Sequence, residues 1–378
     1  MATPVNFIST SPADTVADLR SDYQEISGEP LTPASPENLL LHTYGYAETR
    51  LRMAIQYVAE QNLVAFAQGS TLEALGLLVG VSRLTETPAR LTVEYVLATP
   101  ASTVVTVPAG SSILGDGIRF QTETRAQFLP GESTIQVQAI AVVPGESMNG
   151  IGVGWLTEPG EPLPSNVPFT VSNITASAGG AAIEGDEPLR ARIMLAPEQF
   201  TVAGPAGAYQ FHAFSASPAI VDVAVRGQEL VADPSILPPG GPIPGQVWVY
   251  PLTRTGLPSA EILELVSAAL SPEDVRPLTD WVTVKSPEAI AYAIDVEVRV
   301  AAGHIAETVI RDVRVAMEEL VGELSQRLGN VVVPSIIICR AQTVPGVASV
   351  TLASPVADLE LEPWQWAQNT AIEVQVIT

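Results

Sequence analysis

The sequence has almost no lysine. Lys285 is the only one, and together with arginine it makes 18 basic residues against 41 acidic ones, for a net charge of −23. A protein that binds nucleic acid replaces the counterions of the phosphates with its own cations, and an anionic membrane surface requires the same. The composition therefore argues against DNA, RNA and membrane surfaces as partners. The negative net charge favours solubility, and its electric field would attract a partner with a basic surface.

Cysteine and long apolar runs are also scarce. Cys339 is the single cysteine, so no disulfide can form within the chain, and its apolar setting "VVVPSIIICR" predicts a small buried side chain. No apolar run approaches the roughly 18 residues that a transmembrane helix needs. The opening "MATPVNFISTSPADTVADL" lacks the basic start and apolar core of a secretory signal. These absences predict a protein that is made and folded in a cytoplasm.

Motifs for chemistry are missing as well. His42, His212 and His304 show no metal-ligand spacing with carboxylates or with cysteine. No glycine-rich loop precedes Lys285, and no G-x-S-x-G element is present. Clusters of acidic residues are expected by chance in a chain with this many of them. The sequence predicts no catalytic, cofactor or metal site, and therefore a protein that is not an enzyme.

The residues that are present indicate an α+β multidomain protein. Hydrophobic residues make up 47% of the 378 residues, enough for a core, and 32 prolines and 28 glycines indicate many turns. The periodicity of apolar residues changes along the chain from helical to alternating and then to a mixture. These changes predict five segments: an extended arm (1–37), a helical bundle segment (38–85), a β-rich domain (86–180), an α/β domain (181–300) and a small α+β domain (301–378).

The helical segment carries more apolar residues than one narrow stripe. A helix is predicted over residues 38–68 and ends at Gly69, and a capping box formed by Ser70 and Glu73 starts a second, shorter helix. A short domain cannot bury all the apolar side chains of the long helix. Two alternatives remain: these side chains pack in a core within the domain, or they stay exposed until helices of a partner pack against them. The candidate interface residues are Tyr44, Leu51, Ile55, Val58, Leu63 and Phe66.

The later segments alternate strands and helices. Runs such as "RLTVEYVLA" and "STIQVQAIAVVPG" predict strands of the β-rich domain, and the glycines of "GESMNGIGVGW" fit turns better than a phosphate loop. Towards the C-terminus, "ETVIRDVRVAMEELVGELSQRL" has the stripe of an amphipathic helix. The runs "VVVPSIIIC", "VASVTLA" and "AIEVQVIT" are expected to be strands.

The stretch "EGDEPLRARIMLAPEQF" concentrates two of the few arginines. Asp186 can cap a helix that runs to about Leu195, and the helix contains Arg190 and Arg192. Our hypothesis is that these arginines tie their helix to acidic neighbours within the chain or across a subunit contact. The alternative is that both are solvated. Residues two positions apart do not share a helix face, so we expect at most one of the two to be buried.

Five separated blocks stand out along the chain. In order, they are "QNLVAFAQGSTLEALGLLVGVSRL", "VPAGSSILGDGIRFQTE", "EGDEPLRARIMLAPEQFTVAGPAGAYQFHAFSASPAIVDVAV", "VRPLTDWVTVKSP" and "TVPGVASVTLASP". Together they resemble the baseplate J-like family, whose members are wedge components of contractile phage tails and related injection machines. The first is similar to the family's N-terminal helical signature, the third carries Arg190 and Arg192, and the fourth contains the Arg-Pro-Leu-Thr-Asp turn with Arg276 and Asp280. The third block departs from the family pattern at Gly204-Pro205, which stands in place of a glycine pair.

The resemblance implies a structural role in the virion, at the tail baseplate. It implies that two copies join one smaller wedge protein through N-terminal helices. It also implies that the later domains contact neighbouring wedges and hub- or sheath-proximal baseplate proteins, and it gives Arg190, Arg192, Arg276 and Asp280 structural roles. A β-rich carbohydrate-binding or adhesin-type tail module is the alternative, because Trp155, Trp248, Trp281, Trp364 and Trp366 could stack on sugars.

Overall fold

The computed structural model describes residues 5–33, 35–162, 167–200, 205–227, 241–272, 277 and 279–377. It divides into two compact units, each of which is discontinuous in sequence. The helical unit comprises Met1–Arg83 and Gly185–Ala196, and the larger unit comprises Leu84–Glu184 and Pro197–Thr378. The chain therefore leaves the helical unit after α3 and returns to it for one more helix.

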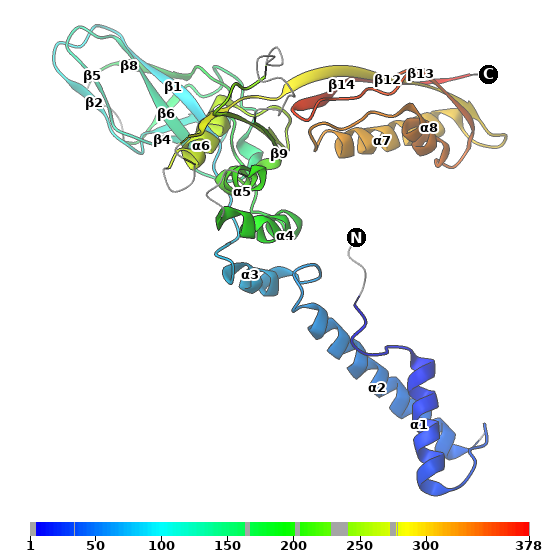
Figure 1. Ribbon diagram of the computed structural model, residues 1–378. Helices are drawn as coiled ribbons and strands as arrows, with labels where there is room; N and C mark the ends of the chain where they lie inside the picture. The colour runs from blue at the N-terminus through cyan, green and yellow to red at the C-terminus, as the bar shows by residue number, and fades with distance from the viewer. Residues whose placement is uncertain are drawn as a thin grey trace. The chain divides into compact units, whose positions relative to one another are not determined.

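The helical unit contains four helices: α1 (Pro12–Ser27), α2 (Pro36–Glu60), α3 (Gly69–Leu77) and α4 (Asp186–Leu195). Helix α1 runs beside α2 (Figure 1) and α4 contacts α3. The prediction of an extended arm over residues 1–37 is wrong for α1. Its start signals are local: the Ser11 side chain accepts the N–H of Asp14, and Pro12 occupies the first turn. Gly28, with φ of +71°, ends it.

Helix α2 ends earlier than predicted, at Glu60 rather than near Gly69. The side chain of Gln61 explains the turn that follows, since it donates to the carbonyl of Phe66 and accepts the N–H of Gln68. The expected capping box at Ser70 is also wrong. The N-cap of α3 is Gln68, without a side-chain hydrogen bond, and Glu73 binds Arg83 instead.

The larger unit begins with an antiparallel sheet of six strands in the order β7-β3-β4-β6-β1-β8, beside the pair β2-β5. Alternating side chains from these strands fill one core, which includes Val93, Tyr95, Phe120 and Phe128. The 3₁₀ turns η1 (Glu146–Met148) and η2 (Ala196–Phe200) lie in the connections. The strands are β1 (Arg90–Leu97), β2 (Val105–Val107), β3 (Ser112–Gly115), β4 (Ile118–Thr122), β5 (Ala126–Phe128), β6 (Thr134–Ala141), β7 (Glu158–Gly160) and β8 (Phe169–Asn173).

Two small α/β layers follow. In the first, α5 and α6 pack on the sheet β11-β10-β9, in which β10 and β11 are parallel. In the second, α7 and α8 lie on one side of the sheet β13-β12-β14 (Figure 1), in which β12 and β14 are parallel. The elements are α5 (Ala206–Ala216), β9 (Ile220–Arg226), β10 (Gln246–Thr253), α6 (Ala260–Leu270), β11 (Trp281–Val284), β12 (Glu288–Val300), α7 (Ala306–Leu324), α8 (Pro334–Gln342), β13 (Val347–Ser354) and β14 (Gln365–Val376). The α+β multidomain class is confirmed.

Three local expectations are wrong in this part of the chain. The run "VVVPSIIIC" ends in helix α8 rather than forming a strand, because Pro334 starts a helix as its first residue. Cys339 lies on the outer side of that helix and is exposed, not buried. Strand β12 pairs with β13 and β14, so the last sheet begins at Glu288 and not after residue 300.

The two α/β layers are joined through a Trp-x-Trp segment. The ring of Trp364 stacks under the guanidinium of Arg226 at 3.8 Å, and the Trp366 indole N–H donates to the carbonyl of Ser325. A Cβ at Gly256 would lie 2.9 Å from the Trp366 ring, so that position needs glycine. These contacts use both tryptophans to fix β9 and the turn after β10 against the last sheet.

A partly buried carboxylate, that of Glu261, joins α6 to the six-stranded sheet. Arg90, at the start of β1, donates through Nε to Glu261 at 3.1 Å and through Nη1 to Glu123 at 2.9 Å. Burial raises the pKa of the Glu261 carboxyl to about 7, against the opposing effect of Arg90. The carboxylates of Glu123 and Glu264 raise the pKa of Glu261 further, because they repel a negative charge on it.

We predict that replacing Glu261 changes how thermal stability depends on pH. The folded state holds a proton on Glu261 that the unfolded state releases above its ordinary pKa of 4.5. The stabilisation that comes from this bound proton is complete below about pH 4.5. It is lost as the pH rises through about 7, where the folded state also releases the proton. Glu261→Gln should therefore raise Tm relative to the native chain by a few degrees at pH 8 and by less at pH 5, as measured by differential scanning calorimetry.

The matched control is Glu307→Gln, since Glu307 is also the second residue of its helix but is exposed. It should shift Tm equally at both pH values. Parallel Tm-against-pH curves for the native chain and Glu261→Gln would contradict the assignment.

Candidate partner interface

Helix α2 contacts α1 through its small and polar residues. A Cβ at Gly45 would lie 2.6 Å from Cγ2 of Val16, so only glycine allows the two helices to approach this closely. Thr49 is buried beside it, and its hydroxyl donates to the Gly45 carbonyl at 2.7 Å. The Asn38 amide accepts from Nε of Arg20 at 2.9 Å. The face of α2 that α1 covers is thus its least apolar face.

The remaining surface of α2 exposes an apolar arc. Its members recur at helical spacing on the faces that α1 leaves open, and a shallow apolar depression is lined by Leu51, Ala54, Ile55, Val58 and Ala59. Monomeric soluble proteins seldom expose a contiguous apolar patch of this kind unless it binds something. The large exposed residues of the arc are Leu39, Leu40, Tyr44, Tyr46, Leu51, Met53, Ile55, Tyr57 and Val58.

The structure places four of the six candidate interface residues in this arc. Tyr44, Leu51, Ile55 and Val58 are exposed on α2. Leu63 and Phe66 follow the end of the helix and are partly buried in the turns that lead to α3. The sequence analysis placed all six on one long helix, whereas the helix ends before the last two.

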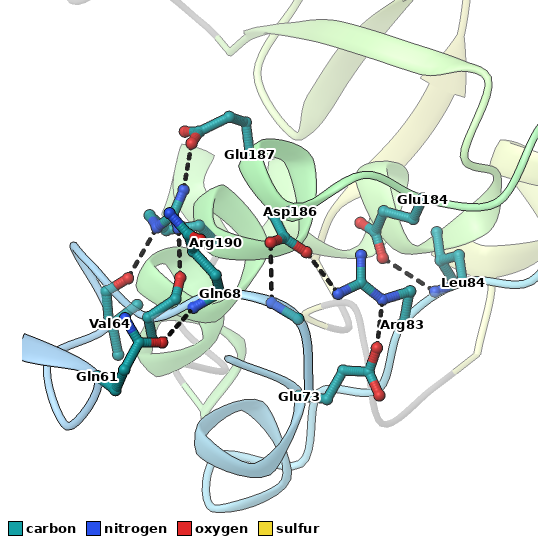
Figure 2. Close-up of polar contacts among 12 residues, drawn as sticks. Gln61, Val64, Gln68, Glu73, Arg83, Leu84, Glu184, Asp186, Glu187 and Arg190 are labelled. Atoms are coloured by element: carbon teal, nitrogen blue, oxygen red, sulfur yellow. Dashed lines mark hydrogen bonds and ion pairs between the residues drawn. The ribbon is translucent and has the colours of Figure 1, made fainter. Parts of the chain in front are cut away.

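Arg190 of α4 binds the turns that precede α3. Its guanidinium donates to the carbonyl oxygen of Val64 at 2.7 Å and to that of Ala67 at 2.5 Å, and it also pairs with Glu187 (Figure 2). The side chain is 11% exposed. The planar fork of arginine suits two carbonyl oxygens held in fixed directions. Arg190 therefore sets the path of the chain between α2 and α3.

The expectation that at most one of the two arginines is buried is confirmed, since Arg190 is only partly buried. Arg192 is the buried one. It is 4% exposed and donates through Nη2 to the carbonyl of Ser82 at 2.5 Å. Helix α4 is short and is enclosed on more than one side, with residues 64–67 against one face and residue 82 against another. These hydrogen bonds from the two arginines to other segments go to backbone carbonyls, whereas the acidic partner of Arg190, Glu187, lies on the same helix.

Asp186 and Arg83 form the ionic part of this cluster. One oxygen of the Asp186 carboxylate accepts the N–H of Gly69 at 2.9 Å, and the other accepts from Nη2 of Arg83 at 2.7 Å (Figure 2). The Gly69 N–H, and after it the Arg83 guanidinium, hold the pKa of Asp186 below its usual range. Arg83 also binds Glu73 at 2.6 Å. Asp186 was predicted to cap its own helix, but it caps α3 instead.

The role of Arg83 could not be found from its spacing, because its partners Glu73 and Asp186 lie 10 and 103 residues away in the sequence.

Asp280 accepts the hydroxyl of the buried Tyr209 at 2.5 Å, which anchors α5 to the start of β11. Arg276 lies outside the described residues. A structural role for Arg190, Arg192 and Asp280 stays a prediction, and these contacts are the kind that such a role requires.

Within the described part of the chain, no group of three or more His, Cys, Asp or Glu side chains could hold a metal ion. Over the same residues, no helix has the length and apolarity needed to cross a membrane.

The tryptophans differ in how far their rings are exposed to solvent. Trp364 and Trp366 are engaged as described, Lys285 covers the ring of Trp248, and Trp155 and Trp281 are exposed.

Comparison with known proteins gives four consecutive family models along the chain. They are the baseplate J-like N-terminal domain (residues 34–90), the baseplate J-like protein barrel domain (91–180), the baseplate J-like central domain (201–286) and the baseplate J-like protein C-terminal domain (292–375). Together they cover nearly all of the sequence in the family's own order. The chain belongs to the baseplate J-like family.

One curated relative is baseplate protein J of Escherichia phage P2, which is 35% identical over 200 residues. That match covers 52% of this chain and 60% of the relative. Among solved structures, the cryo-EM structure of the anti-feeding prophage baseplate covers 94% of this chain at 15% identity, with 90% of its own chain matched and a TM-score of 0.42. That likeness is too weak to support a conclusion. Family membership makes this chain a structural protein of the tail baseplate.

We predict that Arg190→Ala loosens the segment before α3. Two partly buried carbonyl oxygens would lose their donors, which costs about 2 kcal/mol of local stability. Hydrogen exchange should become faster in peptides that cover residues 61–78 and should stay unchanged in those that cover β1. Arg311→Ala, on the exposed surface of α7, is the control and should leave both unchanged. Unchanged exchange at residues 61–78 in Arg190→Ala would contradict the role given to this side chain.

Proposed function

We propose that this protein is a wedge component of the baseplate of a contractile tail, and that α2 joins it to a smaller wedge protein and to a second copy of itself. The observation that carries this proposal is the exposed apolar arc of α2, which the chain's own α1 does not cover. Because α1 takes up the polar face, the arc stays available after the monomer has folded.

The arc has the spacing expected of a helix that packs between other helices. Leu40, Tyr44, Leu51, Ile55 and Val58 follow steps of three, four and seven on one side. A second row, Leu39, Tyr46, Met53 and Tyr57, lies further round the helix. Two rows offer contact to two neighbouring helices at once. This supports a bundle of several chains over a simple pair of helices.

The larger unit has the internal contacts that a rigid scaffold domain needs. Its layers are tied to one another by the pair of Arg90 with Glu261, by the stacking of Trp364 on Arg226, and by the close approach of Trp366 to Gly256. We propose that these layers contact neighbouring wedges and the hub- or sheath-proximal proteins of the baseplate. The same contacts weaken the carbohydrate-binding alternative, since both tryptophans of the Trp-x-Trp segment are engaged within the chain. We also propose that the protein has no enzymatic activity.

We predict that the wedge complex depends on the apolar arc. The chain, co-expressed with the products of neighbouring tail genes, should form a complex of two copies with one smaller protein. Light scattering after size exclusion would measure its mass. The double substitution Leu51→Glu and Ile55→Glu should abolish the complex, because it places charges in an apolar contact, yet it should leave Tm unchanged because both side chains are exposed in the monomer.

Val315→Glu is the matched control, since Val315 is an exposed apolar residue on α7. It should leave the complex intact. A native chain that stays monomeric with every neighbour, or a complex that survives the double substitution, would refute the proposed role of α2.

A further inference from the structure

Arg50 is a charged residue within the exposed apolar arc of α2. Its neighbours one turn away on either side are Tyr46, Ala47, Met53 and Ala54, none of which is charged. Arg50 is itself exposed, and it makes no hydrogen bond or ion pair with any residue that the structure describes. Arg52, two positions further on, instead binds Glu48 at 2.7 Å and Asp18 at 3.7 Å on the side that α1 covers.

Covering the arc would remove water from the Arg50 guanidinium. Arginine stays protonated under all ordinary conditions, so it cannot escape burial by losing its proton. An unpaired buried charge is strongly destabilising, and a carboxylate in a suitable position offsets that loss. Ala47 and Ala54 are small and exposed, so they leave room beside Arg50 for such a group to approach.

A second copy of α2 cannot supply this carboxylate while also covering the arc. Glu48 is already bound by Arg52, which leaves Glu37 and Glu60 as the other acidic residues of the helix. Antiparallel pairing of Arg50 with Glu37 of another copy would leave residues after about 51 without a facing helix. Pairing with Glu60 would leave those before about 50 uncovered. A parallel pair in register would place two Arg50 side chains together.

We propose that the occupant of the arc beside Arg50 is a helix of a different protein, apolar along its contact face, with one Asp or Glu in the layer of Arg50. This inference rests on the proposed wedge function and adds the chemistry of the partner. A single buried ion pair in an otherwise apolar seam fixes the register of the two helices. It also discriminates against helices that are apolar throughout.

The experiment uses the full chain co-expressed with the neighbouring baseplate protein with which it co-purifies. A photo-crosslinking amino acid at position 50 is irradiated in the assembled complex, and the linked peptide is identified by mass spectrometry. We expect the link on the partner, within one helical turn of an Asp or Glu. Arg50→Glu should weaken the complex at least tenfold, and changing that partner residue to Lys should restore it. Arg311→Glu is the charge-reversal control.

A link to the second copy, a link to a layer with no acidic residue within a turn, no link in an intact complex, or native affinity in Arg50→Glu would each overturn this inference. These outcomes leave the wedge function in place, because the native complex has formed in all of them. If the native chain forms no complex at all, the wedge function itself fails, and this inference fails with it.

Discussion

The carbonyl oxygens of Val64, Ala67 and Ser82 receive their hydrogen bonds from arginines that lie more than a hundred residues further along the chain. Arg190 and Arg192 project from α4, and Asp186 at the start of that helix caps α3 in turn. The orientation of α3, and the turns by which α2 leads into it, depend on these contacts. Helix α4 thus acts as the fixed support for the base of the helix that carries the apolar arc.

The same unit separates two kinds of contact on one helix. Asn38 holds α1 by its hydrogen bond to Arg20, and Gly45 by close approach to Val16, while the buried Thr49 bonds back to its own helix; these contacts need little apolar surface. The apolar side chains are left facing outward. This is the opposite of an isolated helical hairpin, in which the apolar faces meet. The monomer can therefore fold without using the surface that we assign to its partners, and Arg50 within that surface limits which partners fit.

Periodicity and turn residues were sufficient to predict the α+β class, the β-rich third segment and the excess of apolar residues on α2. They were not sufficient where long-range contacts decide. Nothing near Arg83 in the sequence indicates Asp186 as its partner, and the carbonyl oxygens that Arg190 and Arg192 bind belong to segments that lie far away. Helix α1 could have been predicted, because Ser11, Pro12 and Gly28 are ordinary cap signals within a polar stretch. Pro334 likewise starts a helix inside a run of residues typical of strands.

The division of the helical unit between two distant segments also bears on how the protein is synthesised. The ribosome completes α1, α2 and α3 first, then the whole six-stranded sheet, and only afterwards the residues of α4. Until α4 emerges, residues 64–83 lack their arginine donors, while the apolar arc of α2 is already exposed to the cell. The β-rich segment is thus complete before the base of α2 becomes rigid. On the function that we propose, a partner of α2 meets a fully supported helix only after α4 has been made.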